Sequence, residues 1–408
     1  MESDNGAHPR LFEHLKVVDL AGDPAGEVVG KVLAQMGADV VKVEPPGGSP
    51  TRSIGPFADD RRDGDHSLTF WYYNTNKRGA VIDYETDEGR TALLALLAGA
   101  DVCITTLPPA EARRLGLTAE ELRAASPALT VVSVTPFGLT GPWADWQSSD
   151  LVGLALGSPL NSCGYDDHSI PPIRPGGDQG YQSAASFAQM GVMLALIERE
   201  QTGEGQIVDV AMHDCLAVGA ELANPYWFYP GVIVQRQTCR HAQPTPTQPA
   251  IFQCGDGRWV YFVIFIAEQK GWRAIVEWLE SKDLAVDLVD PEYSDPAFRQ
   301  QAFGHIQEVV ETFFLLQTAE EAYHEGQARG LAIGPINSPD ELFDDEHLQA
   351  RGFFVSVEHD DVAPALYPGI PFRFSEFDAV DPVRAPKLGE HDDEILPARM
   401  SATAKEAM

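Results

Sequence analysis

The first part of the chain alternates between short apolar runs and apolar residues at helical spacing. Residues 17–20 form an apolar run that stops at a Gly-Asp-Pro sequence. Apolar residues then recur at helical spacing over 28–36, and Gly37 follows at the position where a left-handed backbone favours glycine. A second apolar run, 40–43, ends before two prolines. This pattern predicts a strand–helix–strand unit with a right-handed crossover in a parallel sheet.

The same alternation continues through the next 150 or so residues, as expected for a chain of this length. Apolar runs predict further strands over 80–82, 102–104, 129–134 and 206–210. Helical spacing and capping signals predict helices over 68–73, 86–97, 118–121, 183–200 and 212–223. The fold class is therefore α/β, with a doubly wound parallel sheet.

The pattern changes near Pro225, where an aromatic run suggests a boundary or an interface. Asp256-Gly257 separates two apolar stretches, 251–254 and 259–266, and this is typical of a β-hairpin. Helices are predicted over 270–279, 301–316, 319–329 and 340–349, with extended segments at 333–338 and 353–358. The second part of the chain is therefore expected to be a smaller α+β domain.

Composition and charge limit the possible functions. With 408 residues and 44% apolar residues, the chain is expected to be globular and to form two domains. The net charge of −32 argues against a nucleic-acid partner, because phosphate binding needs a basic surface. The sequence has no apolar run of about 18 residues and no apolar leader, so we expect no membrane segment and a cytoplasmic location.

Several familiar catalytic motifs are missing from the sequence. The loop after the first strand lacks G-x-G-x-x-G, and no G-x-S-x-G, P-loop or metalloprotease motif occurs. Five scattered cysteines include no C-x-x-C pair, and the histidines show no H-x₃-H spacing. These absences argue against a serine hydrolase, a P-loop ATPase and a zinc enzyme, so no metal is expected.

The irregular segment 161–181 is the most informative for chemistry. It places Asp166, Asp167 and Asp178 among glycines, which let a main chain approach a ligand closely. A carboxylate can act as a nucleophile, and backbone N–H groups can stabilise the oxyanion that develops. The other interpretation is that Asp166-Asp167 only begins a solvated turn, because aspartate favours turns.

Seven segments in the same order resemble the family III CoA-transferases (formyl-CoA transferase and carnitine CoA-transferase relatives, also called CaiB/BaiF-like). The resemblance spans residues 15–396. The segments are VVDLAGDPAGEVVGKVLAQMGADVVKVEPPGGSPTR, YNTNKRG, SVTPFGLTGP, CGYDDHSIPPIRPGGDQGY, LIEREQTGEGQIVDVAMHDCL, QCGDGRWV and APKLGEHDDEIL.

The resemblance implies a CoA-transferase that moves coenzyme A from an acyl-CoA to a small carboxylic acid. Such enzymes form an aspartyl anhydride and then an aspartyl-CoA thioester, which keeps the thioester's energy and needs no ATP. The implied nucleophile is Asp167, within GYDDHSIPP. Because two extra residues precede Pro171-Pro172 here, Asp166 remains an alternative.

The resemblance also implies where coenzyme A binds as a substrate, with no metal. The implied CoA-binding residues are Asp23, Pro24, Ala25, Arg52, Lys77, Arg78, Leu107 and Arg114. The chain departs from the family at three places. Pro24 stands where the family often has glutamine, Pro45 stands where it has a basic residue, and the Pro/Thr-rich stretch 243–249 replaces a glycine-rich loop.

Two other functions fit the same resemblance. A 2-methylacyl-CoA racemase of this fold uses a histidine and an aspartate as bases. Here Ser149-Asp150 replaces the histidine-containing pair, while Asp178 matches the aspartate. A catalytically silent CoA-binding protein is the third hypothesis, and the three departures support it.

The family architecture implies a Rossmann-like large domain and an interlocked homodimer. We predict that residues 1–224 form the first part of the large domain, 225–330 the small domain, and 331–408 a segment that returns to the large domain. Proline-rich stretches at 225–249 and 333–339 would suit the extended linkers that interlocking requires.

Overall fold

The computed structural model describes residues 9–220, 223–264 and 267–396, which divide into two compact units. The first unit takes its described residues from Met1–Pro159, Pro175–Gly219 and Glu346–Met408. The second unit consists of Leu160–Arg174 and the described part of Ala220–Asp345. The chain therefore leaves the first unit twice and returns to it twice. The predicted domain boundaries, at residues 225 and 330, stay a prediction.

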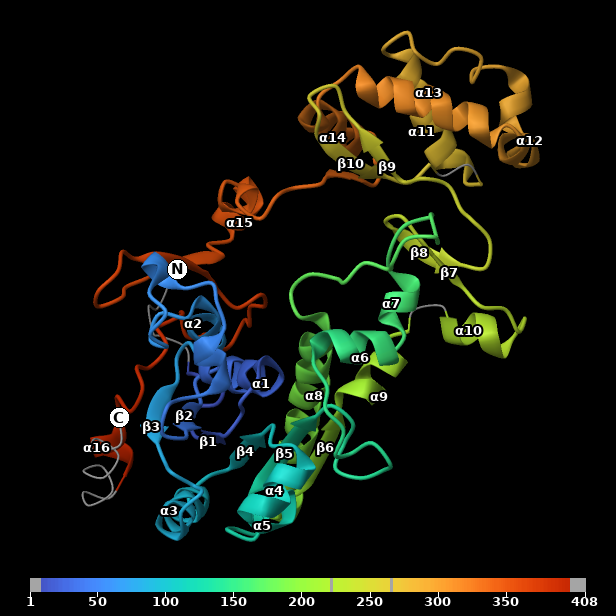
Figure 1. Ribbon diagram of the computed structural model, residues 1–408. Coiled ribbons are helices and arrows are strands. Elements are labelled where there is room, and N and C mark those ends of the chain that lie inside the picture. Colours follow the sequence, from blue (N-terminus) through green and yellow to red (C-terminus); the bar gives the residue numbers. More distant parts are fainter. Residues whose placement is uncertain (1–8, 221–222, 265–266, 397–408) are drawn as a thin grey trace. The chain divides into compact units, whose positions relative to one another are not determined.

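A six-stranded parallel sheet forms the centre of the first unit (Figure 1). Its strand order is β3-β2-β1-β4-β5-β6, so the direction of winding reverses between β1 and β4. The strands are β1 (Lys16–Asp19), β2 (Asp39–Glu44), β3 (Arg78–Val81), β4 (Val102–Thr105), β5 (Thr130–Thr135) and β6 (Ile207–Ala211). This confirms the predicted mixed α/β fold with a parallel sheet.

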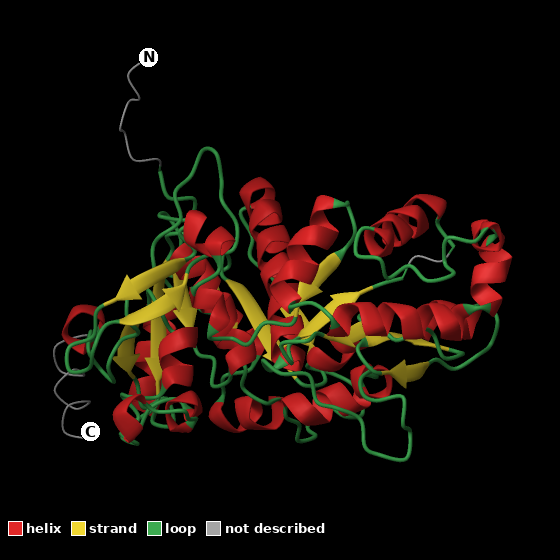
Figure 2. Cartoon of the chain, turned by 90° about the horizontal axis from the view of Figure 1, so that it is seen from above, coloured by secondary structure: helices red, strands yellow, loops and turns green. Residues whose placement is uncertain are grey.

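Helices cover both faces of this sheet because neighbouring strand residues point to opposite sides. Cys103 belongs to the apolar core that α3, α4 and α5 form on one face. The next residue, Ile104, faces α1, where it lies against Gly26. Figure 2 shows these helices in red and the strands in yellow. The helices are α1 (Pro24–Gln35), α2 (Leu68–Tyr73), α3 (Asp87–Leu97), α4 (Pro109–Leu115), α5 (Ala119–Arg123), α6 (Asp150–Leu156), α8 (Gln179–Thr202) and α9 (Met212–Val218), with short 3₁₀ turns η1 (Pro50–Ser53) and η2 (Ala58–Asp60).

The C-terminal segment covers the edge strand β3. The His391 amide donates to the Gly79 carbonyl at 3.0 Å, and the Val81 amide donates to the Asp392 carboxylate at 2.8 Å. These bonds pair an edge that would otherwise be open to another strand. The elements of this segment are α15 (Glu346–Ala350), β12 (Phe354–Val357), β13 (Ala365–Pro368) and α16 (Asp392–Ile395).

The second unit has its own core, built around Phe262, Trp278 and Phe314. Its three-stranded antiparallel sheet has the order β11-β10-β9, and a separate hairpin pairs β7 with β8. The strands are β7 (Gln235–Gln237), β8 (Arg240–Gln243), β9 (Ile251–Gln253), β10 (Trp259–Phe262) and β11 (Ile333–Pro335). The helices are α10 (Ala223–Phe228), α11 (Gln269–Glu280), α12 (Pro296–Gln301), α13 (Phe303–Leu315) and α14 (Ala319–Ala328), with η3 (Pro291–Ser294) and η4 (Glu341–Phe343); α7 (Pro159–Ser162) lies where the chain first enters this unit.

Most predicted elements are confirmed, and three differ from the prediction. The helix predicted over 212–223 ends at Val218, because Gly219 follows it. The helix predicted over 340–349 is divided into η4 and α15. The β7–β8 hairpin was not predicted, because its strands are rich in Gln and Arg and show no apolar alternation. Across the described ranges, none of the helices has the length and apolar character needed to cross a bilayer.

Candidate functional site

A pocket of about 120 Å³ lies at the carboxyl ends of β1, β4 and β5. This is the point where the winding of the sheet reverses, and open parallel sheets bind ligands there. Its walls come from six segments of the first unit. They include Asp23, Ala25, Thr106, Thr135, Trp146, Ser149, Tyr181 and Met212. The pocket therefore contains two of the residues predicted to bind coenzyme A, Asp23 and Ala25, and Pro24 lies between them.

The loop between β1 and α1 is packed tightly against the loop after β4. The Gly22 amide donates to Thr106 Oγ1 at 2.8 Å. A Cβ atom on Gly26 would lie 2.6 Å from Thr106 Cγ2 and 2.5 Å from Ala21 Cβ, closer than atoms can approach. Glycine at position 26 therefore lets the start of α1 approach the switch point.

Asp23 caps helix α1 with its own carboxylate. It accepts hydrogen bonds from the amides of Ala25 at 3.0 Å and Gly26 at 3.4 Å. Burial raises the pKa of Asp23 to about 7, and the nearby Glu27 carboxylate adds to this rise against the opposing effect of the cap bonds. The carboxyl group at this pocket therefore changes its charge close to neutral pH.

Four fully buried charged side chains lie behind this loop, and we call Asp19, Glu27, Lys42 and Lys77 the buried charge cluster. Lys42 Nζ lies 3.0 Å from Glu27 Oε1 and 3.7 Å from Asp19 Oδ1. Lys77 Nζ lies 2.7 Å from Asp19 Oδ2. Burial disfavours ionised Asp19, but the two lysines outweigh this and hold its pKa below the usual value. The cluster thus contains two cations and two anions whose side chains are closed to solvent.

Two predicted CoA-binding cations, Lys77 and Arg52, are held in buried ion pairs. Besides Asp19, Lys77 Nζ donates to the Glu27 carbonyl and to Asn74 Oδ1, both at 2.8 Å. Arg52 pairs with Glu44 at 2.7 Å, and its guanidinium stacks 3.7 Å from the centre of the Phe70 ring. Both side chains therefore stabilise the fold, and their contact with coenzyme A stays a prediction.

The remaining predicted contacts are spread over the first unit. Arg114 is exposed and pairs with Glu85 and Glu111 at 2.9 and 2.5 Å. Leu107 follows β4 and lines a neighbouring pocket of about 160 Å³ on the α4 side. The structure thus brings Asp23 and Ala25 into one pocket. Thr106 lines the same pocket, and Leu107 is the residue that follows it in the chain.

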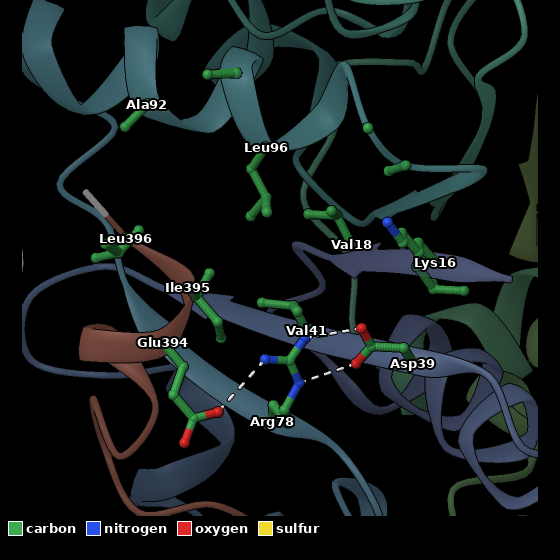
Figure 3. Close-up of a pocket in the computed structure, with 14 residues that line it drawn as sticks. Lys16, Val18, Asp39, Val41, Arg78, Ala92, Leu96, Glu394, Ile395 and Leu396 are labelled. Atoms are coloured by element: carbon green, nitrogen blue, oxygen red, sulfur yellow. Dashed lines mark hydrogen bonds and ion pairs between the residues drawn. The ribbon is translucent and has the colours of Figure 1, made fainter. Parts of the chain in front are cut away.

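Arg78 lies at the other end of the strands. It is the first residue of β3, and it donates to both carboxylate oxygens of Asp39, the first residue of β2, at 2.9 and 2.8 Å. Figure 3 shows this pair among the residues that line a pocket of about 390 Å³, together with Leu96 and Ile395. Arg78 therefore does not line the pocket that contains Asp23.

Asp166 and Asp167 lie on a loop of the second unit, fastened to the β7–β8 hairpin. The Asp166 carboxylate accepts from Arg240 at 2.6 Å, and its amide donates to Thr238 Oγ1 at 3.0 Å. Arg236 donates to the Ile170 carbonyl at 2.6 Å. The hairpin that the sequence pattern missed therefore holds the loop that carries the candidate nucleophile.

The Asp167 carboxylate is exposed and has a different environment. Its Oδ1 accepts from the amide and the hydroxyl of Ser169, at 2.8 and 2.6 Å. These two bonds hold the pKa of Asp167 below its usual value. Asp167 is therefore an ionised carboxylate at neutral pH, and Asp166 is the partner of an arginine.

The residues considered for racemase chemistry have structural roles. Asp150 is buried and accepts the amides of Gly180 and Tyr181, at 2.8 and 3.4 Å. Ser149 caps α6 through its hydroxyl. Asp178 precedes α8 with a left-handed backbone, φ 51°. Asp150 thus links the start of α6 to the start of α8.

Sequence reasoning missed the aromatic part of the pocket. Trp143 and Trp146 stack with ring centres 5.1 Å apart, and both lie against Phe137. Of these, Trp146 lines the pocket together with Tyr181. The signal was present in the sequence, since both tryptophans directly follow the glycine- and proline-rich loop at the end of β5.

No group of His, Cys, Asp and Glu side chains in the described residues is arranged to hold a metal ion. None of the five cysteines, all of which lie in the described ranges, forms a disulfide.

Comparison with known proteins adds an independent finding. The family model of CoA-transferase family III matches residues 12–392. Subunit BbsE of succinyl-CoA:(R)-benzylsuccinate CoA-transferase from Thauera aromatica is 33% identical, over 94% of this chain and 93% of that protein. Formyl-CoA:oxalate CoA-transferase from Streptomyces avermitilis is 30% identical, over 95% of this chain and 94% of that protein. A CAIB/BAIF family protein from Brucella suis has a similar crystal structure, with a TM-score of 0.81, 27% identity and coverage of 97% and 100%.

Proposed function

The chain belongs to CoA-transferase family III, and on this premise we propose that it moves coenzyme A from an acyl-CoA to a small carboxylic acid, with Asp167 as nucleophile. The single observation that carries the choice of residue is the contrast between neighbouring carboxylates. Both carboxylates are exposed, but Asp166 is paired with Arg240, whereas Asp167 is kept ionised by two hydrogen bonds from Ser169. An ionised, accessible carboxylate is the form that attacks a thioester.

The proposed reaction has four steps that balance. The Asp167 carboxylate attacks the thioester carbonyl, the C–S bond breaks, and the CoA thiolate leaves behind an aspartyl–acyl anhydride. The thiolate then attacks the aspartyl carbonyl, which gives an aspartyl-CoA thioester and frees the first acid. The acceptor carboxylate attacks the aspartyl carbonyl of this thioester, the C–S bond breaks, and the CoA thiolate leaves behind a second anhydride. Finally, the thiolate attacks the new acyl carbonyl, which releases the new acyl-CoA and restores Asp167.

We assign coenzyme A binding to the switch-point pocket of the first unit. Its position at the carboxyl ends of β1 and β4 is where parallel sheets bind ligands. The protein carries a net charge of −32, so an anionic substrate approaches against an unfavourable general field. Asp23 lies at this pocket, and we expect binding of coenzyme A to weaken as Asp23 ionises above about pH 7.

Trapping of the intermediate tests the choice of nucleophile. The purified protein is incubated with a panel of acyl-CoA donors and then with hydroxylamine, which converts an aspartyl thioester into a hydroxamate detectable by peptide mass spectrometry. We expect the modification on Asp167 and its loss, together with transfer activity, in Asp167→Asn. Asp166→Asn is the matched control, because it removes the neighbouring carboxylate; a hydroxamate on Asp166 would reverse the assignment.

The same panel distinguishes the other functions that the family resemblance implied. Exchange of the α-hydrogen of an acyl-CoA in D₂O, without any acceptor acid, would identify a racemase. Binding of coenzyme A without turnover of any donor would identify a silent binding protein. Transfer that requires both a donor and an acid supports the proposed reaction.

We also propose that the chain forms a homodimer, as the family resemblance implied. Helix α8 exposes an apolar stripe at helical spacing, with Met190, Leu194 and Ile197 exposed to 51, 68 and 56%. Large apolar patches on a protein surface mark interaction sites. Light scattering after size exclusion measures the mass directly: we expect a dimer for the natural chain and a monomer for Leu194→Glu.

A further inference from the structure

Both backbone polar atoms of Ala21 are bound by the buried charge cluster. The Ala21 amide donates to Asp19 Oδ1 at 2.9 Å, and its carbonyl accepts a short hydrogen bond from Lys42 Nζ. The next amide, that of Gly22, donates to Thr106 Oγ1 at 2.8 Å. Side chains from β1, β2 and the loop after β4 therefore fix the course of the chain immediately before Asp23.

Lys42 is the member of the cluster that reaches from β2 to this loop. Its ammonium group is fully buried, so it does not contact solvent or a ligand in the pocket. Glu27 and Asp19 lie 3.0 and 3.7 Å away and raise the pKa of Lys42 against the effect of burial, so Lys42 stays charged. A charged donor makes a stronger hydrogen bond to a carbonyl than a neutral one.

Glu27 shows that the cluster is not simply arranged for the best hydrogen bonding. Its Oε1 accepts from Thr51 Oγ1 at 2.7 Å and pairs with Lys42. Its Oε2 is buried and accepts no hydrogen bond from the described residues. Such a carboxylate costs stability unless a nearby charge compensates it. Lys42, 3.0 Å from Glu27 Oε1, supplies that compensating charge, and the pair places a cation at the Ala21 carbonyl.

We propose that Lys42 is a positioning residue for coenzyme A binding: it holds the Ala21 carbonyl inward and so sets the course of the loop that carries Asp23 and Ala25 to the pocket. The expected effect of Lys42 on the affinity for coenzyme A rests on the proposed function. The effect of Lys42 on the loop does not, because the hydrogen bond to the Ala21 carbonyl is made within the free protein. Lys42 thus acts on the ligand through the main chain.

Three variants of the full chain separate positioning from charge balance. Lys42→Met with Glu27→Gln removes one cation and one anion together, so Asp19 remains paired with Lys77 while the bond to Ala21 is lost. Glu27→Gln alone removes the charge partner but keeps that bond. Arg299→Met is the matched control, because Arg299 is a fully buried cation of the second unit that donates to the Tyr293 carbonyl at 2.7 Å.

Two measurements are made on each variant: hydrogen–deuterium exchange of peptides covering residues 20–26 in the free protein, and the dissociation constant for coenzyme A by calorimetry. In the double variant we expect exchange and the dissociation constant to increase about tenfold, as for a lost hydrogen bond to a charged group. In Glu27→Gln and Arg299→Met we expect both to stay within about twofold of the natural chain, a few tenths of a kcal/mol.

Unchanged exchange over residues 20–26 in the double variant overturns the proposal. If that variant does not fold, Glu27→Gln decides, because faster exchange there would assign the effect to the charge balance and not to Lys42. If the natural chain does not bind coenzyme A, the proposed function fails, and the exchange result still decides the role of Lys42.

Discussion

Two loops carry the candidate chemistry, and they are held in opposite ways. The β1–α1 loop of the first unit is fixed from inside, by fully buried charges that bind its main chain. The loop around Asp167 in the second unit is fixed from its surface, by Arg236 and Arg240 of a polar hairpin. Buried charges permit little movement, because separating them leaves an uncompensated charge. A pair with one half-exposed partner, such as Arg240–Asp166, is weaker because water reaches the carboxylate.

This difference suits two different tasks. A loop that binds a ligand gains affinity when its main chain is already in place before binding. The carboxylate proposed to form the two covalent intermediates would need access to acids that arrive from the solvent. Its loop must also accommodate groups of different size. The comparison therefore predicts a rigid binding loop and a more mobile catalytic loop.

Removal of the buried Lys42 ammonium group should have the largest effect on stability. We expect Lys42→Met to lower the free energy of unfolding by about 3–5 kcal/mol, because it leaves an unbalanced carboxylate in the interior. Urea denaturation followed by circular dichroism measures this loss. A change below about 1 kcal/mol would mean that water reaches the cluster, and the contrast between the two loops would then fail.

The second-largest effect should be that of Asp23 on the pH dependence of the free energy of unfolding. Folding raises the pKa of Asp23 from 3.8 to about 7. At a pH between these two values, the Asp23 carboxyl therefore holds a proton in the folded protein that it has released in the unfolded chain. This contribution to the free energy of unfolding therefore falls as the pH rises through that interval, by about 1–3 kcal/mol.

Asp23→Asn should remove that slope, because asparagine also caps a helix but does not ionise. Denaturation midpoints of both proteins between pH 4 and 8 test this. Curves that stay parallel throughout would show that Asp23 is not responsible.

A substitution of Arg240 tests the second loop of the comparison, the one around Asp167. We expect Arg240→Met to change the free energy of unfolding by only about 1 kcal/mol, because its partner Asp166 is half exposed. Exchange of amides in residues 163–170 should nevertheless accelerate, and kcat should fall more than the affinity for coenzyme A. An equal loss in both would indicate that the hairpin does not act on the catalytic loop alone.

Arg78 should give the smallest effect. Its pair with Asp39 is partly exposed, so Arg78→Met should cost less than about 1 kcal/mol, and the cost should shrink in 0.5 M salt. The same variant tests the CoA contact predicted for Arg78. A large rise in the dissociation constant for coenzyme A would confirm that contact, although Arg78 lies at the amino end of its strand.

Pocket size alone would not have selected the proposed site. A pocket of about 390 Å³ lies at the amino ends of the strands, and the Arg78–Asp39 ion pair is among its lining residues (Figure 3). The switch-point pocket is smaller, about 120 Å³, but loops and the start of α1 converge there. In a parallel sheet the main-chain geometry favours ligands at the carboxyl ends, whatever the size of other cavities.

Consecutive residues were sufficient to predict most of the helices and strands. Helix α2 has the predicted bounds, Thr118 and Glu121 form the predicted capping box, and Gly37 has the predicted positive φ. Each of these features depends on hydrogen bonds or steric limits within a few residues, so the letters of the sequence contain the necessary information. The β7–β8 hairpin lacked such a local signal, and it was missed.

The roles of the cations could not be predicted in this way. Lys77 pairs with a carboxylate 58 positions away, and Arg52 donates to a carbonyl 334 positions away. A basic residue before a strand looks the same in sequence whether it binds a phosphate or a buried carboxylate. Only the packing of distant segments removed these charges from water and selected their partners, because the energy of a charge depends on its surroundings and not on its neighbours in the chain.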